Sequence, residues 1–69
     1  MNVAEIRKRL TGGFRPFSLR TSDGREFRVP HPEFIAIGRH SIAVVDKDGL
    51  IDLLDPLHIS SIKELSARK

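Results

Sequence analysis

The side chains of this 69-residue chain that could do chemistry are three histidines and one group with the residue types of a hydrolytic triad. His31, His40 and His58 include no pair at the i, i+2 or i+4 spacing that is typical of a local metal site. Ser41 and Asp46 lie near His40 in the chain, but adjacent positions do not provide the geometry of a triad. A chain this short also has little room for a cleft that excludes water. We therefore expect no enzyme activity, no metal site and no cofactor.

Turn chemistry accounts for the acidic residues near the expected loop tips. The segment Asp46-Lys47-Asp48-Gly49 has some likeness to a calcium loop, but it lacks the glutamate that a full loop needs and it lies between β-branched residues. Asp-Gly pairs, which occur at 23–24 and 48–49, are typical of hairpin turns. We interpret both as turns rather than as ligand sites.

The chain is basic, with a formal net charge of +3, and the charge is unevenly placed. Residues 1–39 carry eight basic and four acidic residues, whereas residues 40–69 carry four basic and five acidic residues. Arginine outnumbers lysine eight to four, and guanidinium groups bind phosphate in a bidentate manner and stack on bases. Four arginines are therefore candidates for nucleic-acid contact: Arg20, Arg25, Arg28 and Arg39. The aromatic residues are four phenylalanines that a core can account for, so no exposed stacking ring is assured.

The N-terminal segment predicts a short helix over residues 2–11. Val3, Ile6 and Leu10 fall on one helical stripe, and two glycines follow the segment. A helix of this length is marginal in isolation, so it must dock through that stripe. Charges interrupt the apolar pattern of this segment, which excludes a signal peptide, and no apolar run has the length of a membrane span. We expect a cytoplasmic protein with no membrane insertion.

Alternating apolar and polar residues predict a β-hairpin over residues 17–29. A three-residue loop closed by a left-handed Gly24 pairs Leu19 with Phe27 and keeps both on one face. A two-residue loop would instead place Leu19 opposite Arg28. The alternation therefore favours the three-residue loop.

The rest of the chain predicts further short strands and one helical turn. Strands are expected at residues 33–37, 42–45 and 50–54, with a break at Pro30-His31-Pro32 and a helical turn at 57–60. Residues 61–65 fit either a last strand, which we favour, or a short helix. We expect a single domain, with a barrel over residues 16–65 and a frayed tail at residues 66–69.

The second expected hairpin is apolar on both faces. Ile42 and Val44 point one way, and Ala43 and Val45 point the other way. A strand that is apolar on both sides is covered on both sides, and in so small a chain the second cover is either the helix or another subunit. A core of this size is also marginal alone, and no cysteine is present to form a disulfide. We therefore expect a homo-oligomer with these candidate interface residues: Ile42, Val44, Val45, Ile51 and Leu53.

The order of these elements resembles the layout of an SH3-like small barrel, and more specifically the Sm-like barrel of the bacterial RNA chaperone. The resemblance rests on the helix at 2–11, the hairpin from Phe17 to Phe27 and the closing segment from Leu57 to Ile62. It implies a mainly β fold, a five-stranded barrel with a short N-terminal α-helix, which assembles into rings and binds single-stranded RNA. Carried over, the RNA-facing loops contain Arg39, His40 and His58. The sequence departs from the family at Leu57, where a lysine is usual.

A second resemblance involves the segments Phe14-Arg15-Pro16-Phe17, Asp23-Gly24-Arg25 and Val29-Pro30-His31-Pro32-Glu33. This pattern is similar to that of a group of small uncharacterised bacterial proteins. The similarity implies a bacterial origin and no known activity.

Two functions are left open by these patterns. The first is a non-catalytic, oligomeric module that binds RNA or another single-stranded nucleic acid through Arg39, His40, His58, Arg20, Arg25 and Arg28. The alternative is a protein–protein interaction module that acts through a strand edge or an apolar β-surface.

Overall fold

The computed structural model describes residues 2–65, so the predicted tail at residues 66–69 lies outside the described residues. Strands dominate these residues, with one short α-helix and two 3-10 helices. In chain order the elements are α1 (Val3–Lys8), β1 (Phe17–Thr21), β2 (Glu26–Val29), η1 (Pro32–Phe34), β3 (Ile35–Ile37), β4 (Ile42–Val45), β5 (Ile51–Leu54), η2 (Pro56–His58) and β6 (Ile59–Glu64). The fold is therefore mainly β, as the sequence predicts.

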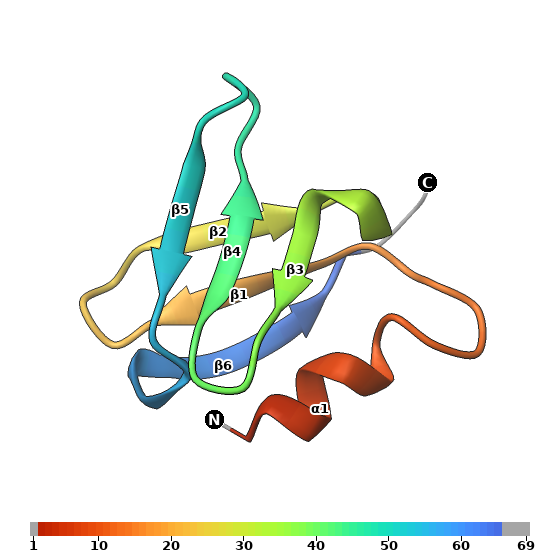
Figure 1. The fold of residues 1–69 in the computed structure, drawn as a ribbon, viewed down its shortest axis with the longest axis horizontal. Coiled ribbons are helices and arrows are strands. Elements are labelled where there is room, and N and C mark those ends of the chain that lie inside the picture. The colour runs from red at the N-terminus through yellow and green to blue at the C-terminus, as the bar shows by residue number, and fades with distance from the viewer. Residues whose placement is uncertain (1, 66–69) are drawn as a thin grey trace.

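The strands form two separate three-stranded antiparallel sheets, with the orders β2-β1-β6 and β3-β4-β5. Figure 1 shows the strands of the second sheet crossing those of the first. No strand pairing joins the two sheets within the described part of the chain, so the prediction of a closed five-stranded barrel is wrong. The physical reason lies at Pro30 and Pro32, where a proline-initiated 3-10 turn ends the ladder. β2 and β3 therefore belong to different sheets instead of forming one long bent strand.

The first hairpin has the predicted register. Leu19 pairs with Phe27, and the neighbouring apolar residues Phe17 and Val29 also pair. Gly24 has φ 89°, a left-handed conformation that favours glycine, and it closes the three-residue loop. All the apolar side chains of this hairpin therefore face the same side.

The closing segment is a strand, as favoured from the sequence. The helical turn before it spans Pro56–His58, so it begins one residue and ends two residues earlier than the predicted 57–60, and the strand already begins at Ile59. The Asp55 side chain accepts a hydrogen bond from the Leu57 amide at 3.0 Å, and Pro56 occupies the first turn, so this 3-10 helix is capped and begins at a proline. β6 then pairs with β1, with an irregularity in register between Arg20 and Thr21.

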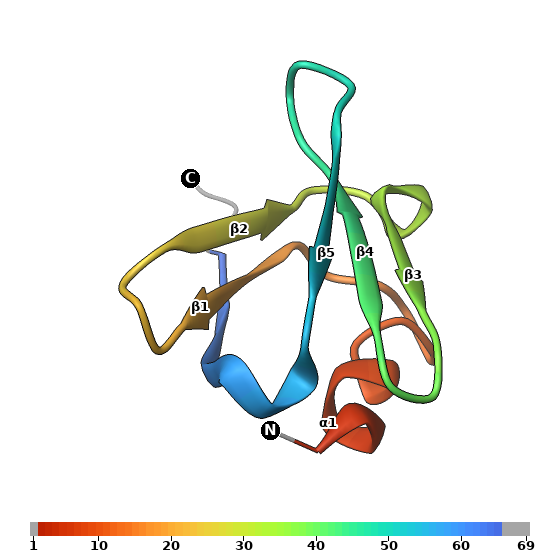
Figure 2. The same cartoon turned by 60° about the vertical axis from the view of Figure 1, so that its left-hand side comes forward.

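The helix α1 is shorter than predicted and covers one end of the two sheets. Asn2 caps it by accepting a hydrogen bond from the Ala4 amide at 2.9 Å. Ile6 is its fully buried residue, and half-buried Leu10 packs against the same core. Figures 1 and 2 show α1 beside the turn between β3 and β4, not over the outer face of that sheet. Among residues 2–65, no helix has the length and apolarity that crossing a membrane requires.

One apolar core lies between the two sheets. Its buried members come from the helix, from both sheets and from the strand after η2: Ile6, Phe17, Leu19, Val29, Ile35, Ile42, Val44, Leu54 and Ile59. Each sheet therefore presents one apolar face to the other sheet, as expected for two packed layers. The opposite face of each sheet points outward.

We expect Ile6 to be the residue that anchors the helix. Ile6→Ala should lower the free energy of unfolding by about 2–5 kcal/mol, and the milder Ile6→Val by about 0.5–1.5 kcal/mol. Urea titration followed by far-ultraviolet circular dichroism measures this in a chain without Trp or Tyr. Leu57→Ala, at a side chain that is 84% exposed, is the control and should change stability by less than about 0.5 kcal/mol. A loss for Ile6→Val no larger than the control would contradict this anchoring role.

Candidate functional site

The structure separates the six predicted nucleic-acid residues into three places. Arg25 and His58 line a cleft at the turn between β1 and β2, whereas Arg39 and His40 line a second cleft beside η2. Arg20 and Arg28 lie on the outer face of the β2-β1-β6 sheet, in strand positions that alternate with buried residues. The six residues therefore do not form one continuous site.

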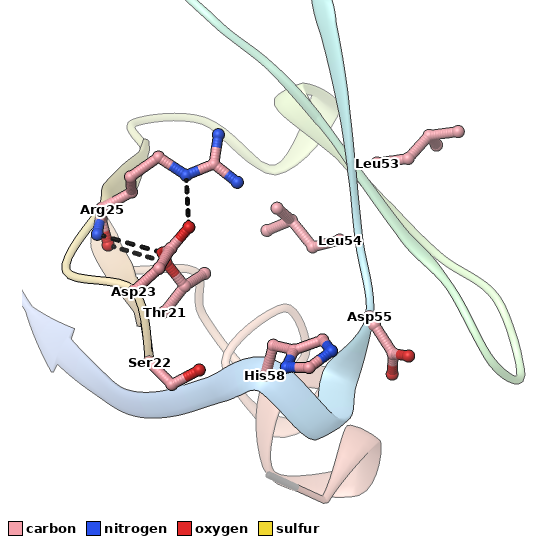
Figure 3. A pocket seen from close by; sticks show the side chains of 8 residues that line it. All are labelled: Thr21, Ser22, Asp23, Arg25, Leu53, Leu54, Asp55 and His58. Carbon is pink, nitrogen blue, oxygen red and sulfur yellow. Dashed lines mark hydrogen bonds and ion pairs between the residues drawn. The ribbon is translucent and has the colours of Figure 1, made fainter.

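The first cleft has a volume of about 520 Å³ and lies between the β1–β2 turn and the end of β5 (Figure 3). Leu54 points into it, while Leu53 points away on the other side of β5 (Figure 3). The Ser22 amide donates to the His58 carbonyl oxygen at 2.7 Å, which ties the hairpin turn to η2. This backbone hydrogen bond therefore holds the β1–β2 turn and η2 together.

A compact network occupies the hairpin side of this cleft. The Asp23 carboxylate accepts from Arg25 Nε at 3.1 Å and from the hydroxyl of the buried Thr21. These contacts lower the pKa of Asp23 below its usual 3.8, chiefly through the Thr21 hydrogen bond and further through Arg25. The Arg25 guanidinium also lies 5.2 Å from the centre of the Phe27 ring. Arg25 is therefore partly neutralised and held in place, which makes it a weak ligand for an added phosphate.

The second cleft, of about 370 Å³, brings together the two loops that the resemblance assigned to RNA. Arg39 and His40 from one loop face Asp55 and Leu57 from the other, beside Val3 of the helix. His58 lies outside this set and lines the first cleft instead. Both a carboxylate, Asp55, and a guanidinium, Arg39, line this cleft, so its charge is mixed.

A third cleft, of about 400 Å³, lies between β2 and the β4–β5 hairpin. Phe27 and Val44 form its apolar part. Its charged residues are three acids and two bases: Glu26, Asp46, Asp52, Arg28 and Lys47. Charged side chains therefore make up most of the lining of this gap between the two sheets.

The predicted oligomer-interface residues lie on two different faces. Ile42 and Val44 are 0% and 1% exposed, so they belong to the core and have no surface left for a partner. Val45, Ile51 and Leu53 lie on the outer face of the β3-β4-β5 sheet. Alternation along the strands accounts for this division, because neighbouring residues point to opposite faces.

The outer face of the β3-β4-β5 sheet is entirely apolar. Ala36, Ala43 and Leu53 form one cross-strand row, and Val45 and Ile51 form the next. Ile51 is 64% exposed and Leu53 is 75% exposed. Ala36 was not identified from the sequence as part of this face, although its place between two apolar neighbours in β3 is a signal that could have found it. These five residues are hereafter called the apolar face.

Neither a metal site nor a known relative identifies the function. Within residues 2–65 there is no group of three His, Cys, Asp or Glu side chains that could hold a metal ion. No protein-family model, no curated protein and no solved structure matches the chain. The two resemblances noted in the sequence stay predictions.

We expect the Thr21 hydroxyl to control the ionisation of Asp23. Thr21→Val removes the largest cause of the shift, so the pKa of Asp23 should rise towards 3.8 in a carboxyl-carbon NMR titration. The native contacts favour ionised Asp23. Their contribution to stability is therefore complete above pH 3.8 and is lost as the pH falls through the lowered folded-state pKa. Ser22→Ala, in the same turn, is the control and should leave the pKa of Asp23 unchanged. An unchanged pKa in Thr21→Val would refute this assignment.

Proposed function

We propose that this chain is a non-catalytic protein-interaction module whose binding surface is the apolar face and whose partner is a second copy of the chain. The observation that supports this is the exposure of Ile51 and Leu53 on a sheet face with no polar side chain. Contiguous apolar surface of this kind marks interaction sites in soluble proteins. The helix does not cover this face, which leaves another subunit as the second cover expected for a two-sided strand.

The composition of the apolar face favours self-association over a foreign partner. None of its five side chains carries a charge or a hydrogen-bonding group that would select a partner of different chemistry. A flat apolar face is complementary to itself in a two-fold arrangement, in which the same patch serves both subunits. Two such faces would pack as aligned sheets about 10 Å apart.

The expected strength of this association follows from the area available. Fully burying a Leu or Ile side chain contributes about 1.5–3 kcal/mol. A symmetric pair would bury Ile51 and Leu53 twice, and four side chains that are each about two-thirds exposed contribute about 4–8 kcal/mol. Association costs about 4–15 kcal/mol in lost freedom, and Val45 and the two alanines add further burial. We therefore expect a reversible dimer whose population depends on concentration.

The face is a better binding surface than the neighbouring strand edge. β5 is an edge strand, and the ladder with β4 directs the backbone groups of Ile51 and Leu53 away from β4. Asp52 lies between them and points inward beside the buried Val44. Antiparallel pairing of two β5 edges with Ile51 opposite Leu53 would set Asp52 opposite the second copy's Asp52. Like charges directly opposite each other destabilise a strand pair, so Asp52 protects this edge.

We expect Leu53→Asp to abolish self-association. The substitution removes apolar burial and places a carboxylate in a dry interface, so the dissociation constant should rise by at least about 100-fold. Sedimentation equilibrium over a range of concentrations should then report the mass of one chain, 7.8 kDa. Circular dichroism checks that the variant is folded, and Ile51→Ser provides a milder second test at the same face.

Leu57→Asp is the matched control for this experiment. Leu57 is the most exposed large apolar residue, at 84%, but it lies on η2 rather than on the apolar face. This variant should associate as the unmodified chain does. An unmodified chain that stays monomeric at every concentration would overturn the proposal, and so would equal losses for Leu53→Asp and Leu57→Asp.

A further inference from the structure

The outer face of the other sheet is basic. Ser18 of β1 pairs with Arg28 on one side and with Lys63 on the other, so these three side chains form one cross-strand row. Arg20 lies two residues further along β1 and therefore points to the same side, in a row with Glu26 and Ser61. We call Arg20, Arg28 and Lys63 the basic face.

These three cations have no ion-pair partner among the described residues. The ion pairs within residues 2–65 involve other bases: Lys8 with Glu5, Arg9 and Arg15 with Glu64, and Arg25 with Asp23. Glu26 is the one acid in these two rows, and it forms no ion pair with Arg20 although the two residues are cross-strand neighbours. Arg28 also lines the third cleft, where Asp46, Asp52 and Lys47 lie, but it forms no ion pair with either acid among the described residues. The two rows themselves carry three cations and one acid.

The spacing of the cations suits a regular array of phosphates. Neighbouring strands are about 4.8 Å apart, so the strands that carry Arg28 and Lys63 are separated by about 10 Å across β1. Arg20 lies about 7 Å along β1 from the row of Ser18. A nucleic-acid duplex carries about one negative charge per 1.7 Å of its axis, so several phosphates lie within this span.

We infer that the basic face binds the phosphodiester backbone of double-stranded nucleic acid, independently of base sequence. Recognition of single strands depends on exposed rings that stack on the bases, and these two rows contain no aromatic residue. In a duplex the bases are already stacked and the phosphates face outward, so cations alone provide contact. The three cations replace Arg39, His40 and His58 as the proposed contacts for nucleic acid.

The chemistry of the face favours nucleic acid over other anionic partners. A protein interface needs an apolar centre, and a membrane-surface site needs apolar residues that enter the lipid. Ser18, at the centre of the first row, is buried, and the exposed positions of the two rows carry Ser61 and charged residues instead of large apolar side chains. This inference does not rest on self-association, because all three cations belong to one chain.

The test is fluorescence anisotropy with labelled DNA and RNA duplexes of about two helical turns (~20 base pairs), and with the separate strands. Three phosphate contacts predict a slope of log affinity against log salt concentration of about −2.7 for each duplex. A tenfold rise in salt should therefore weaken binding by about 500-fold. Each single strand should bind less tightly than the duplex at the same salt concentration.

Charge-removing variants identify the contacts. Arg20→Gln, Arg28→Gln and Lys63→Gln should each reduce the magnitude of the slope by about 0.9. Arg7→Gln removes the same charge at an exposed position on α1, outside the basic face, and it should leave the slope unchanged. All these positions are exposed, so circular dichroism should show the same fold in every variant.

Several results would overturn the inference. They are no binding at low salt, tighter binding to single strands than to duplexes, equal effects of the basic-face and control variants, or equally effective competition by an acidic polypeptide. A higher affinity for one of the two duplexes would show whether the basic face prefers DNA or RNA. Leu53→Asp should keep the slope of the unmodified chain, so failure of this inference and failure of the proposed self-association are distinguishable.

Discussion

The burial of one face of each small sheet against the other is the interaction on which the rest of this structure depends. Phe17 and Leu19 from one sheet and Ile42 and Val44 from the other are almost completely inaccessible, and Ile6 adds the helix to the same core. Besides these two sheets, residues 2–65 form one short α-helix and two 3-10 helices. The composition of the outer faces of the sheets is free of the demands of the core, and these faces are the surfaces that we propose for contacts with other molecules.

Local chemistry explains the part of the fold that could be predicted. The register of the first hairpin follows from a three-residue loop in which Gly24 adopts a positive φ. The loop length and the conformation of Gly24 can both be predicted from residues that are close in the sequence. The alternation in β4 correctly separates Ile42 and Val44 from Ala43 and Val45. It does not show which of the two faces is interior. That choice depends on packing between sheets, and so the list of candidate interface residues mixed core and surface positions.

Contacts between distant segments explain what could not be predicted. A closed barrel needs pairing between edges of the two sheets, and no such pairing exists among residues 2–65. Charged side chains line the cleft between β2 and the β4–β5 hairpin. Lys63 lies in the same row as Arg28 only because β6 and β2 both pair with β1. The spacing of residues within β2 or within β6 does not predict that these two side chains share a row. The loops with histidine and arginine contain residue types that suit nucleic acid, but Asp23 holds Arg25 in an ion pair. Arg39 forms no ion pair among the described residues, but it lines a cleft that also contains the Asp55 carboxylate. Charge in the sequence indicates a binding site only when the fold leaves that charge unpaired.

The two outer surfaces differ in the physical terms that would drive their binding. The apolar face gains from burial and loses little when salt is added, whereas the basic face acts through counterion release and weakens steeply with salt. They lie on opposite sides of one core, so two chains joined through their apolar faces would direct their basic faces away from each other. Each basic face would then meet a separate duplex, because both cannot contact one duplex at the same place. In this arrangement self-association converts a weak single contact into a link between two duplexes without any new residue at the nucleic-acid surface.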